Sequence, residues 1–250
     1  MQYGDDLAYI HHTAFGSFAD EAAPGLIARL HHAGIRHGLV VDLACGSGIW
    51  ARHLLDAGFD VVGIDASPAM IEIARTVAPR AHFIVGSAHT VDIPPCAAVT
   101  AIGEGLTYLT SDVDDLDLAS LFRRVHNALQ PRGLFIFDVV ERSVETPMSY
   151  EASQTGSDWT LEVAVVENSA RRLLTRRIGI RRSAAEGARC TTEVHYVRTF
   201  DRGEVETLLR TAGFDVELTL TYGARALLPQ RIAFFAQKRP CTTDRLHLRH

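Results

Sequence analysis

The stretch Leu39–Trp50, LVVDLACGSGIW, decides the fold. Apolar residues interrupted by a single acid, Asp42, lead into a run of small residues and then into an amphipathic helical pattern. This order indicates a buried parallel strand, a tight turn and the N-terminus of a helix. Small residues let the backbone come close to a ligand, and the first turn of a helix offers free N–H groups and a partial positive charge. The stretch therefore predicts a ligand cradle.

The glycines of this turn fit more than one interpretation. The spacing Gly46-x-Gly48-x-x-Ala51 matches the G-x-G-x-x-G/A fingerprint of dinucleotide-binding proteins. Asp65 ends the next predicted strand, where a carboxylate can accept hydrogen bonds from both hydroxyls of a ribose. A ribose is common to several cofactors, so this acid does not discriminate between them. A strand–helix turn without any ligand is a further interpretation.

Strands and helices alternate beyond this turn. Ser47 is expected to cap the first helix, and Ser67 followed by Pro68 predicts the start of the second. Because parallel neighbours are joined by right-handed helical crossovers, the alternation favours an α/β fold. The predicted strands lie at 60–65, 82–85, 97–102 and 134–140, and the predicted helices at 47–57, 69–78 and 116–129.

The remaining segments suggest additions to this α/β core. Residues 1–37 are predicted to form an N-terminal helical cap, with Tyr9 and His12 placed to cover a ligand. Residues 143–200 contain long alternating runs at 159–166, 173–182 and 190–200, which predict an inserted antiparallel β lid. We expect its arginines to be mostly a solvated or salt-bridged surface. The core resumes over 201–238, and residues 239–250 are expected to be a loose tail.

The composition limits the kinds of molecule that the protein is expected to bind. The formal net charge of −5 argues against a nucleic-acid-binding protein that relies on a basic surface. No window approaches the roughly 18–20 apolar residues needed to span a bilayer, so no membrane association is expected. The 4 cysteines are scattered without a CxxC or HExxH motif, which indicates a reduced compartment and no metal site. We therefore expect a cytoplasmic protein that acts on small molecules.

Several ordered motifs resemble those of class I S-adenosylmethionine-dependent methyltransferases. The loop Asp42-x-Ala44-x-Gly46-x-Gly48 resembles the acid-plus-glycines loop of that family, with Ala44 where glycine is usual. The stretch 86–88, GSA, resembles the loop that reads the adenine edge, although an acid usually stands at the serine. The stretch 102–104, IGE, matches the position that lines the methionyl end. The turn in NALQPRGLFIFDV and the closing LRTAGF and RIAFFAQK segments complete the resemblance.

The resemblance implies a fold, a cofactor and a reaction. The expected fold is a Rossmann-like, seven-stranded, mostly parallel sheet with a reversed last strand, helices on both faces and an antiparallel β insertion. The expected domain with this fold covers 38–142 and 201–238. The expected cofactor is S-adenosyl-L-methionine, and the expected reaction is methyl transfer to an oxygen or nitrogen of a small-molecule acceptor. The residues implied to bind the cofactor are Asp42, Ala44, Cys45, Gly46, Gly48, Asp65, Ala66, Met70, Ser87, Ala88, Ile102, Gly103, Glu104 and Tyr9.

The identity of a catalytic base is left open by the sequence. His12 in the cap, Glu104 after the fourth strand and His195 in the lid are the candidates. An NAD(P)-dependent oxidoreductase is the alternative enzyme, but Lys238 is the only lysine, so a Tyr–Lys pair has no usual place. A non-catalytic S-adenosylmethionine-binding protein is the other alternative. A monomer and a homodimer are equally compatible with the sequence.

Overall fold

The computed structural model describes residues 3–110, 116–184 and 187–240 of the chain. Its centre is a seven-stranded sheet in which only the last strand, β14, runs antiparallel to its neighbours. The predicted α/β fold with a reversed last strand is therefore confirmed. In spatial order the strands are β11 (Phe214–Thr219), β14 (Arg231–Lys238), β6 (Leu129–Val140), β4 (Cys96–Ala101), β1 (Leu39–Leu43), β2 (Asp60–Asp65) and β3 (His82–Val85).

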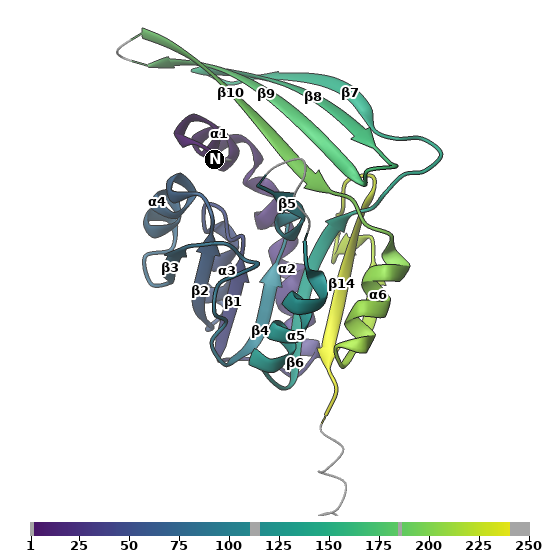
Figure 1. Cartoon of the computed structure of the whole chain (residues 1–250). Helices are drawn as coiled ribbons and strands as arrows, with labels where there is room; N and C mark the ends of the chain where they lie inside the picture. Colours follow the sequence, from purple (N-terminus) through teal and green to yellow (C-terminus); the bar gives the residue numbers. More distant parts are fainter. Residues whose placement is uncertain (1–2, 111–115, 185–186, 241–250) are drawn as a thin grey trace, which may run out of the picture.

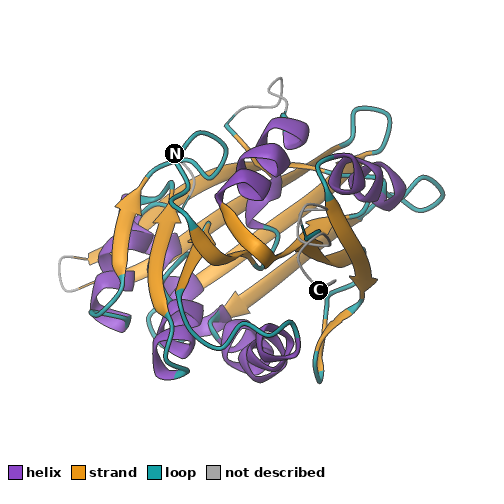
Figure 2. Ribbon diagram, turned by 90° about the horizontal axis from the view of Figure 1, so that it is seen from below, coloured by secondary structure: helices purple, strands orange, loops and turns teal. Residues whose placement is uncertain are grey.

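Helices cover both faces of this sheet, as Figure 2 shows from below. On one face lie α2 (Ser17–His32), α3 (Ile49–Asp56) and α4 (Pro68–Val77). On the other face lie α5 (Leu118–Ala128) and α6 (Arg202–Thr211). Because successive side chains of a strand point to opposite faces, every strand except the edge strand β11 contributes to both apolar clusters. This is the physical reason why the strands consist of nearly continuous apolar residues.

A second, five-stranded antiparallel sheet lies across one end of the first (Figure 1). It contains more strands than the sequence predicted. Every residue of β7 is exposed, so this strand lacks the alternation that reveals a half-buried strand. The short β5 is supplied by the segment between β4 and α5. In spatial order the strands are β5 (Tyr108–Leu109), β10 (Gly187–Arg198), β9 (Leu173–Ala184), β8 (Trp159–Asn168) and β7 (Ser149–Thr155).

The predicted N-terminal helical segment forms two helices with different neighbours. While α2 packs on the first sheet, α1 (Asp5–Phe15) lies beneath the second sheet. Leu7 and Ile10 of α1 share an apolar cluster with Trp159 of β8 and Ile178 of β9. The first helix is thus held by the second sheet, the predicted lid, as well as by the body of the protein.

Several local predictions are corrected by the structure. The helix after the glycine turn begins at Ile49, and its N-cap is Gly48 in a left-handed conformation rather than Ser47. Ser67 caps α4 as predicted, because its side chain accepts a hydrogen bond from the Met70 N–H. The strand predicted at 134–140 begins earlier, at Leu129.

The C-terminal part of the described chain is also more ordered than expected. Arg239 in the predicted tail pairs with Asp215 at 3.0 Å and donates to the carbonyl of Phe214 at 2.9 Å. Residues 241–250 of that prediction lie outside the described residues. A small hairpin of β12 (Thr221–Tyr222) and β13 (Arg225–Ala226) precedes β14 and was not predicted. Among the described residues, no helix combines the length and the apolar character needed to cross a membrane.

Candidate active site

The predicted cradle lies where the strand order of the first sheet reverses. From β1 the chain proceeds outward through β2 and β3 on one side, and through β4 and β6 on the other. Ligands of open α/β sheets bind outside the carboxyl ends of the strands at such a switch point. The loops after β1, β2, β3 and β4 all end at this edge. They contain most of the cofactor-binding positions predicted from the sequence; the others are Asp42 in β1, Asp65 at the end of β2, Met70 in α4 and Tyr9 in α1.

The two glycines of the first loop have different structural tasks. Gly46 and Gly48 both adopt left-handed conformations, with φ of 53° and 77°. A Cβ atom on Gly48 would lie 3.0 Å from Ala74 of α4, so this glycine allows two helices to approach each other. A Cβ atom on Gly46 would meet nothing within 4 Å. The backbone of Gly46 therefore borders open space, where a ligand can contact it.

The alanine that departs from the family pattern has a compensating neighbour. Ala44 is left-handed, with φ of 53°, which costs an L-residue about 1–2 kcal/mol. Its methyl group occupies space next to Gly105, where a Cβ atom would lie only 2.4 Å from that of Ala44. The missing glycine in the first loop is thus matched by a glycine after β4.

Asp65 closes the cradle at the end of β2. Its two carboxylate oxygens accept hydrogen bonds from the backbone N–H of Gly46 at 2.9 Å and of Ser67 at 2.8 Å. Burial raises the pKa of Asp65 above its usual value, although the two N–H donors oppose this effect. Each oxygen of a carboxylate has a second lone pair. Asp65 therefore fixes the loop and can still accept hydrogen bonds from ribose hydroxyls.

Asp42 supports the loop from within the sheet. Its side chain is buried and accepts a hydrogen bond from Thr100 Oγ1 at 2.7 Å. Thr100 in turn accepts one from the indole N–H of Trp50 at 3.1 Å. Burial raises the pKa of Asp42 to about 7, against the opposing effect of the Thr100 hydrogen bond. Burial also raises the pKa of the neighbouring Cys45 thiol, so this cysteine is not an activated nucleophile.

The other predicted cofactor positions line the same edge with different exposure. Met70 and Ala88 are buried, Ile102 is partly buried, and Ala66 and Ser87 are exposed. The hydroxyl of Ser87 accepts the N–H of His89 at 3.2 Å, which organises the loop after β3.

The N-terminal segment touches the cradle at two serines. His12 Nδ1 lies 3.0 Å from Ser47 Oγ, which explains why Ser47 does not cap α3. Ser67 Oγ donates a hydrogen bond to the carbonyl of Tyr3 at 2.6 Å. The beginning of the chain therefore lies against the loops that follow β1 and β2.

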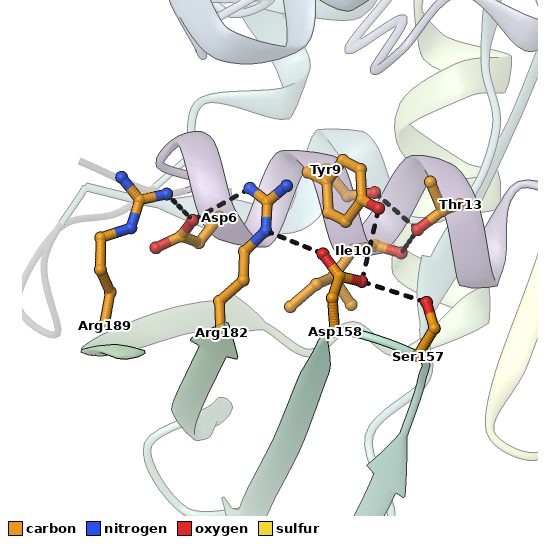
Figure 3. A network of polar contacts seen from close by, with 8 residues as sticks. All are labelled: Asp6, Tyr9, Ile10, Thr13, Ser157, Asp158, Arg182 and Arg189. Atoms are coloured by element: carbon orange, nitrogen blue, oxygen red, sulfur yellow. Dashed lines mark hydrogen bonds and ion pairs between the residues drawn. The ribbon is translucent and has the colours of Figure 1, made fainter. Parts of the chain in front are cut away.

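Tyr9 contacts residues of the second sheet and its adjoining turn, and its role at the cofactor stays a prediction. Figure 3 shows its ring directed toward the second sheet, where the Arg182 guanidinium lies 3.7 Å from the ring centroid. Arg182 and Arg189 both pair with Asp6, at 3.1 and 2.6 Å, and Arg182 also pairs with Asp158 at 3.4 Å. These contacts bind α1 to the lid. They also show that the lid's arginines are not all solvated.

Glu104, a predicted cofactor contact and candidate base, is paired with two arginines, and we call these ion pairs the clamp. Its carboxylate forms ion pairs with Arg176 of β9 and, at 2.5 Å, with Arg231 of β14. Although burial alone would raise the pKa of Glu104, the two arginines hold it below the usual value. An ionised carboxylate with two cationic partners is a poor proton acceptor. Glu104 instead joins the loop after β4 to the second sheet.

Asp138 is a functional position that the sequence reasoning missed. Its carboxylate accepts the N–H groups of Gly103 and Glu104, both at 2.7 Å, and the hydroxyl of Tyr222 at 2.7 Å. Burial raises the pKa of Asp138 to about 6, although the Tyr222 hydrogen bond opposes this. The one acid within the apolar run LFIFDVV was the available signal. Asp138 fixes the loop that carries Gly103 and the left-handed Glu104.

A polar cluster lies between the second sheet and the N-terminal segment. The hydroxyls of Tyr3 and Tyr108 are 3.0 Å apart, and Arg176 donates to Tyr108 at 2.9 Å. The buried ring of His195 lies beside both tyrosines, with centroids 5.0 and 5.7 Å away. We call this set of contacting residues the acceptor chamber, after the role proposed for it below; it consists of Tyr3, His11, Glu104, Tyr108, Arg176, Glu193 and His195.

Comparison with known proteins finds similarity to methyltransferases. A family model described as a methyltransferase domain matches residues 40–133. An uncharacterized methyltransferase of Synechocystis is 32% identical over 102 residues, which span 38% of this chain and 44% of the relative. A dTDP-3-amino-3,6-dideoxy-alpha-D-glucopyranose N,N-dimethyltransferase of Streptomyces fradiae is 27% identical over 222 residues, or 86% of each chain.

Solved structures agree over nearly the whole length. A S-adenosylmethionine-dependent methyltransferase from Clostridium acetobutylicum superposes with a TM-score of 0.78 at 16% identity, covering 93% of this chain and 97% of that one. An amino pentose methyltransferase from Micromonospora echinaspora has a TM-score of 0.72 at 20% identity, covering 92% and 94%. At these identities the superpositions show a shared fold. With the domain model that matches residues 40–133 and the cradle geometry, they support a class I S-adenosylmethionine-dependent methyltransferase.

Proposed function

We propose that the protein transfers a methyl group from S-adenosylmethionine to an oxygen or nitrogen of a small molecule held in the acceptor chamber. The observation that carries this proposal is the second sheet, which lies across the cofactor end of the first sheet and buries polar side chains there. The Streptomyces relative is named for the N,N-dimethylation of an amino sugar nucleotide, which supports a small acceptor.

The cradle residues fit this cofactor. The backbone of Gly46 borders open space, and Asp65 keeps lone pairs for ribose hydroxyls. Ala88 and Gly103 lie in the loops after β3 and β4, where the adenine and the methionyl end would be held. When bound, S-adenosylmethionine supplies a methyl group already activated on a sulfonium. The chain's own task is then to bind, orient and exclude water.

Orientation is the main contribution expected of the protein. Holding two reactants in line can lower the barrier by about 7–11 kcal/mol. In this chain, Glu104 and Asp138 fix the loop after β4, while Arg176 connects that loop to the lid. The acceptor chamber is thereby kept in a constant position relative to the cradle.

Among the three candidate bases, His195 is favoured. Glu104 is paired with two arginines, and His12 Nδ1 already lies 3.0 Å from the Ser47 hydroxyl. His195 is 1% exposed, and its Nδ1 has no hydrogen-bond partner among the described residues. His12 is therefore proposed to position the first loop, and His195 to face the acceptor.

The expectations about metal binding, localisation, partners and oligomeric state also stay proposals. The described residues contain no group of three potential ligands arranged for a metal ion. Cys45, Cys96 and Cys190 are free thiols, which supports action in the cytoplasm. No nucleic-acid or membrane partner is proposed, and the protein is proposed to act as a monomer or homodimer.

The test is a transfer assay with methyl-labelled S-adenosylmethionine and a panel of amine- and hydroxyl-bearing metabolites. We expect label in at least one small product, with stoichiometric formation of S-adenosylhomocysteine. Cofactor binding without transfer to any acceptor would favour a non-catalytic binding protein. Hydride exchange with NADH, in place of methyl transfer, would favour an oxidoreductase.

A further inference from the structure

Glu193 of β10 joins three donors that come from two distant parts of the chain. Its carboxylate accepts a hydrogen bond from His195 Nε2 at 2.7 Å. It also accepts the backbone N–H groups of Tyr3 at 2.8 Å and of Gly4 at 2.9 Å. Burial alone would raise the pKa of Glu193, but these hydrogen bonds hold it below its usual value. The carboxylate is therefore ionised and accepts from all three donors.

The contact with Glu193 determines which nitrogen of the neutral His195 ring carries the proton. A carboxylate only accepts, so Nε2 must donate and the proton resides there. When the ring is neutral, its lone pair lies on Nδ1, which is buried without a hydrogen-bond partner among the described residues. This nitrogen can then accept a proton.

The surroundings of the ring restrict what can bind to that lone pair. The titratable groups that face it are Tyr3 of the N-terminal segment, Tyr108 of β5 and Glu193 of its own strand. Beyond them, His11 packs against Tyr3, and Arg176 is paired with Glu104. Since Arg176 and Arg231 are both paired with Glu104, the chamber lacks a free cation for a carboxylate acceptor among the described residues.

The two residues bound by Glu193, Tyr3 and Gly4, form what we call the N-terminal strap. The other side of the strap touches the cradle, because the carbonyl of Tyr3 accepts the hydroxyl of Ser67. Ser67 itself donates its N–H to Asp65. Tyr3 has a φ of 56°, a left-handed conformation that is unfavourable for an L-residue. The strap is therefore held in a strained conformation by contacts at the lid and at the ribose turn.

We propose that Glu193 is a positioning residue that couples closure of the N-terminal strap to the orientation of His195 as proton acceptor, and that the methyl acceptor is an amine or hydroxyl. This inference rests on the proposed function. The acceptor oxygen or nitrogen forms the new bond to the methyl carbon as the carbon–sulfur bond breaks, and that bond's electron pair remains on sulfur. The acceptor's proton moves to His195 Nδ1. When the strap is open, Glu193 loses two of its donors and His195 loses a fixed partner.

The first test measures the wild-type protein without any acceptor. Nitrogen-15 NMR of histidine-labelled protein distinguishes the two neutral tautomers, and His195→Asn identifies the signal. We expect the proton of His195 on Nε2 and slow hydrogen exchange at the amides of Tyr3 and Gly4. A proton on Nδ1, or unprotected amides in the folded protein, would overturn the coupling.

The second test compares Glu193→Gln with Glu162→Gln. Glu162 lies on the exposed face of β8 and provides the matched control. A glutamine offers one acceptor oxygen where three donors converge, so Glu193→Gln should accelerate exchange at Tyr3 and Gly4 by about 10-fold or more. It should also mix the His195 tautomers, whereas Glu162→Gln should leave both measurements at wild-type values. A Glu193→Gln protein that matches wild type in both respects would contradict the proposal.

These measurements are independent of methyl transfer. A failure to bind S-adenosylmethionine would contradict the proposed function. The hydrogen-exchange result for the strap and the tautomer result for His195 would still be valid. Once an acceptor is known, Glu193→Gln should lower kcat by about 10-fold or more, with little change in KM for the acceptor. An unchanged kcat with a raised KM would contradict a role of Glu193 in orienting His195.

Discussion

The cofactor cradle and the acceptor chamber are built in opposite ways. The cradle consists mainly of backbone, in loops that follow strands β1 to β4, and its key glycine and acid are 19 residues apart. The chamber consists of side chains from distant segments: the contact between Tyr3 and Glu193 joins residues 190 apart. The comparison teaches that the proposed cofactor site is fixed by contacts within one part of the chain, while the proposed acceptor site depends on contacts between distant segments.

The two regions also differ in which groups stabilise their carboxylates. In the cradle, Asp65 is satisfied by two backbone N–H groups. In the chamber, Glu104 is satisfied by two arginines that come from different strands. Removing the charge of Asp65 should therefore weaken binding of the cofactor. Removing the charge of Glu104 should lower the free energy of unfolding.

The largest effect is expected for Glu104→Gln. This change leaves Arg176 and Arg231 without their carboxylate in a buried environment, where breaking an ion pair costs about 3–5 kcal/mol. Urea denaturation should show this loss in the free energy of unfolding. Glu206→Gln, which breaks an exposed pair with Arg210 on α6, is the control and should cost less than about 0.5 kcal/mol. Equal losses in the free energy of unfolding for the two variants would show that the ion pairs of Glu104 contribute no more to stability than an exposed pair.

A smaller effect separates binding from stability in the cradle. Gly46→Ala and Gly58→Ala both place an L-residue at a left-handed position with no atom within 4 Å of the new methyl group. Each should lower the free energy of unfolding by about 1–2 kcal/mol. Only Gly46→Ala should also abolish calorimetric binding of S-adenosylmethionine, because its methyl group fills the cradle. If both variants bound the cofactor equally, Gly46 would not border the ligand.

The smallest effect concerns pH and the acid beneath the first loop. The pKa of Asp42 is raised to about 7 in the folded protein, above its ordinary 3.8. Its contribution to stability is therefore complete below about pH 4 and is lost as the pH rises through 7. Asp42→Asn should reduce the difference in unfolding free energy between pH 5 and pH 8. Asp60→Asn, at the exposed start of β2, is the control and should leave that difference unchanged. If Asp42→Asn also left the difference unchanged, this account would be contradicted.

The sequence predicted the parts of the molecule that follow from local pattern. The buried strands, the Ser67–Pro68 helix start and the position of Asp65 at a strand end were all recognisable. Strand β7 was missed because all of its residues are exposed and give no alternation. The cap at Ser47 was wrong because the His12 ring, 35 residues earlier, binds the hydroxyl.

Long-range pairing accounts for the other differences. The contacts of Tyr9 with Arg182 and Asp158 were not predicted, and its role at the cofactor stays a prediction. Glu104 was expected as a possible base, and two arginines in later strands form the clamp with it. Asp138 and Glu193 were not singled out, because their partners lie far away in the sequence. No pattern within one segment specifies such contacts.

The most direct test of the central claim is calorimetric titration of the wild type and Asp65→Ala with S-adenosylmethionine, S-adenosylhomocysteine and NADH. We predict that the wild type binds both sulfur ligands and not NADH. Loss of two charge-assisted hydrogen bonds in Asp65→Ala should weaken binding by about 100-fold or more. Asp60→Ala is the matched control and should bind like the wild type. Binding of NADH alone, or unchanged binding by Asp65→Ala, would contradict the account.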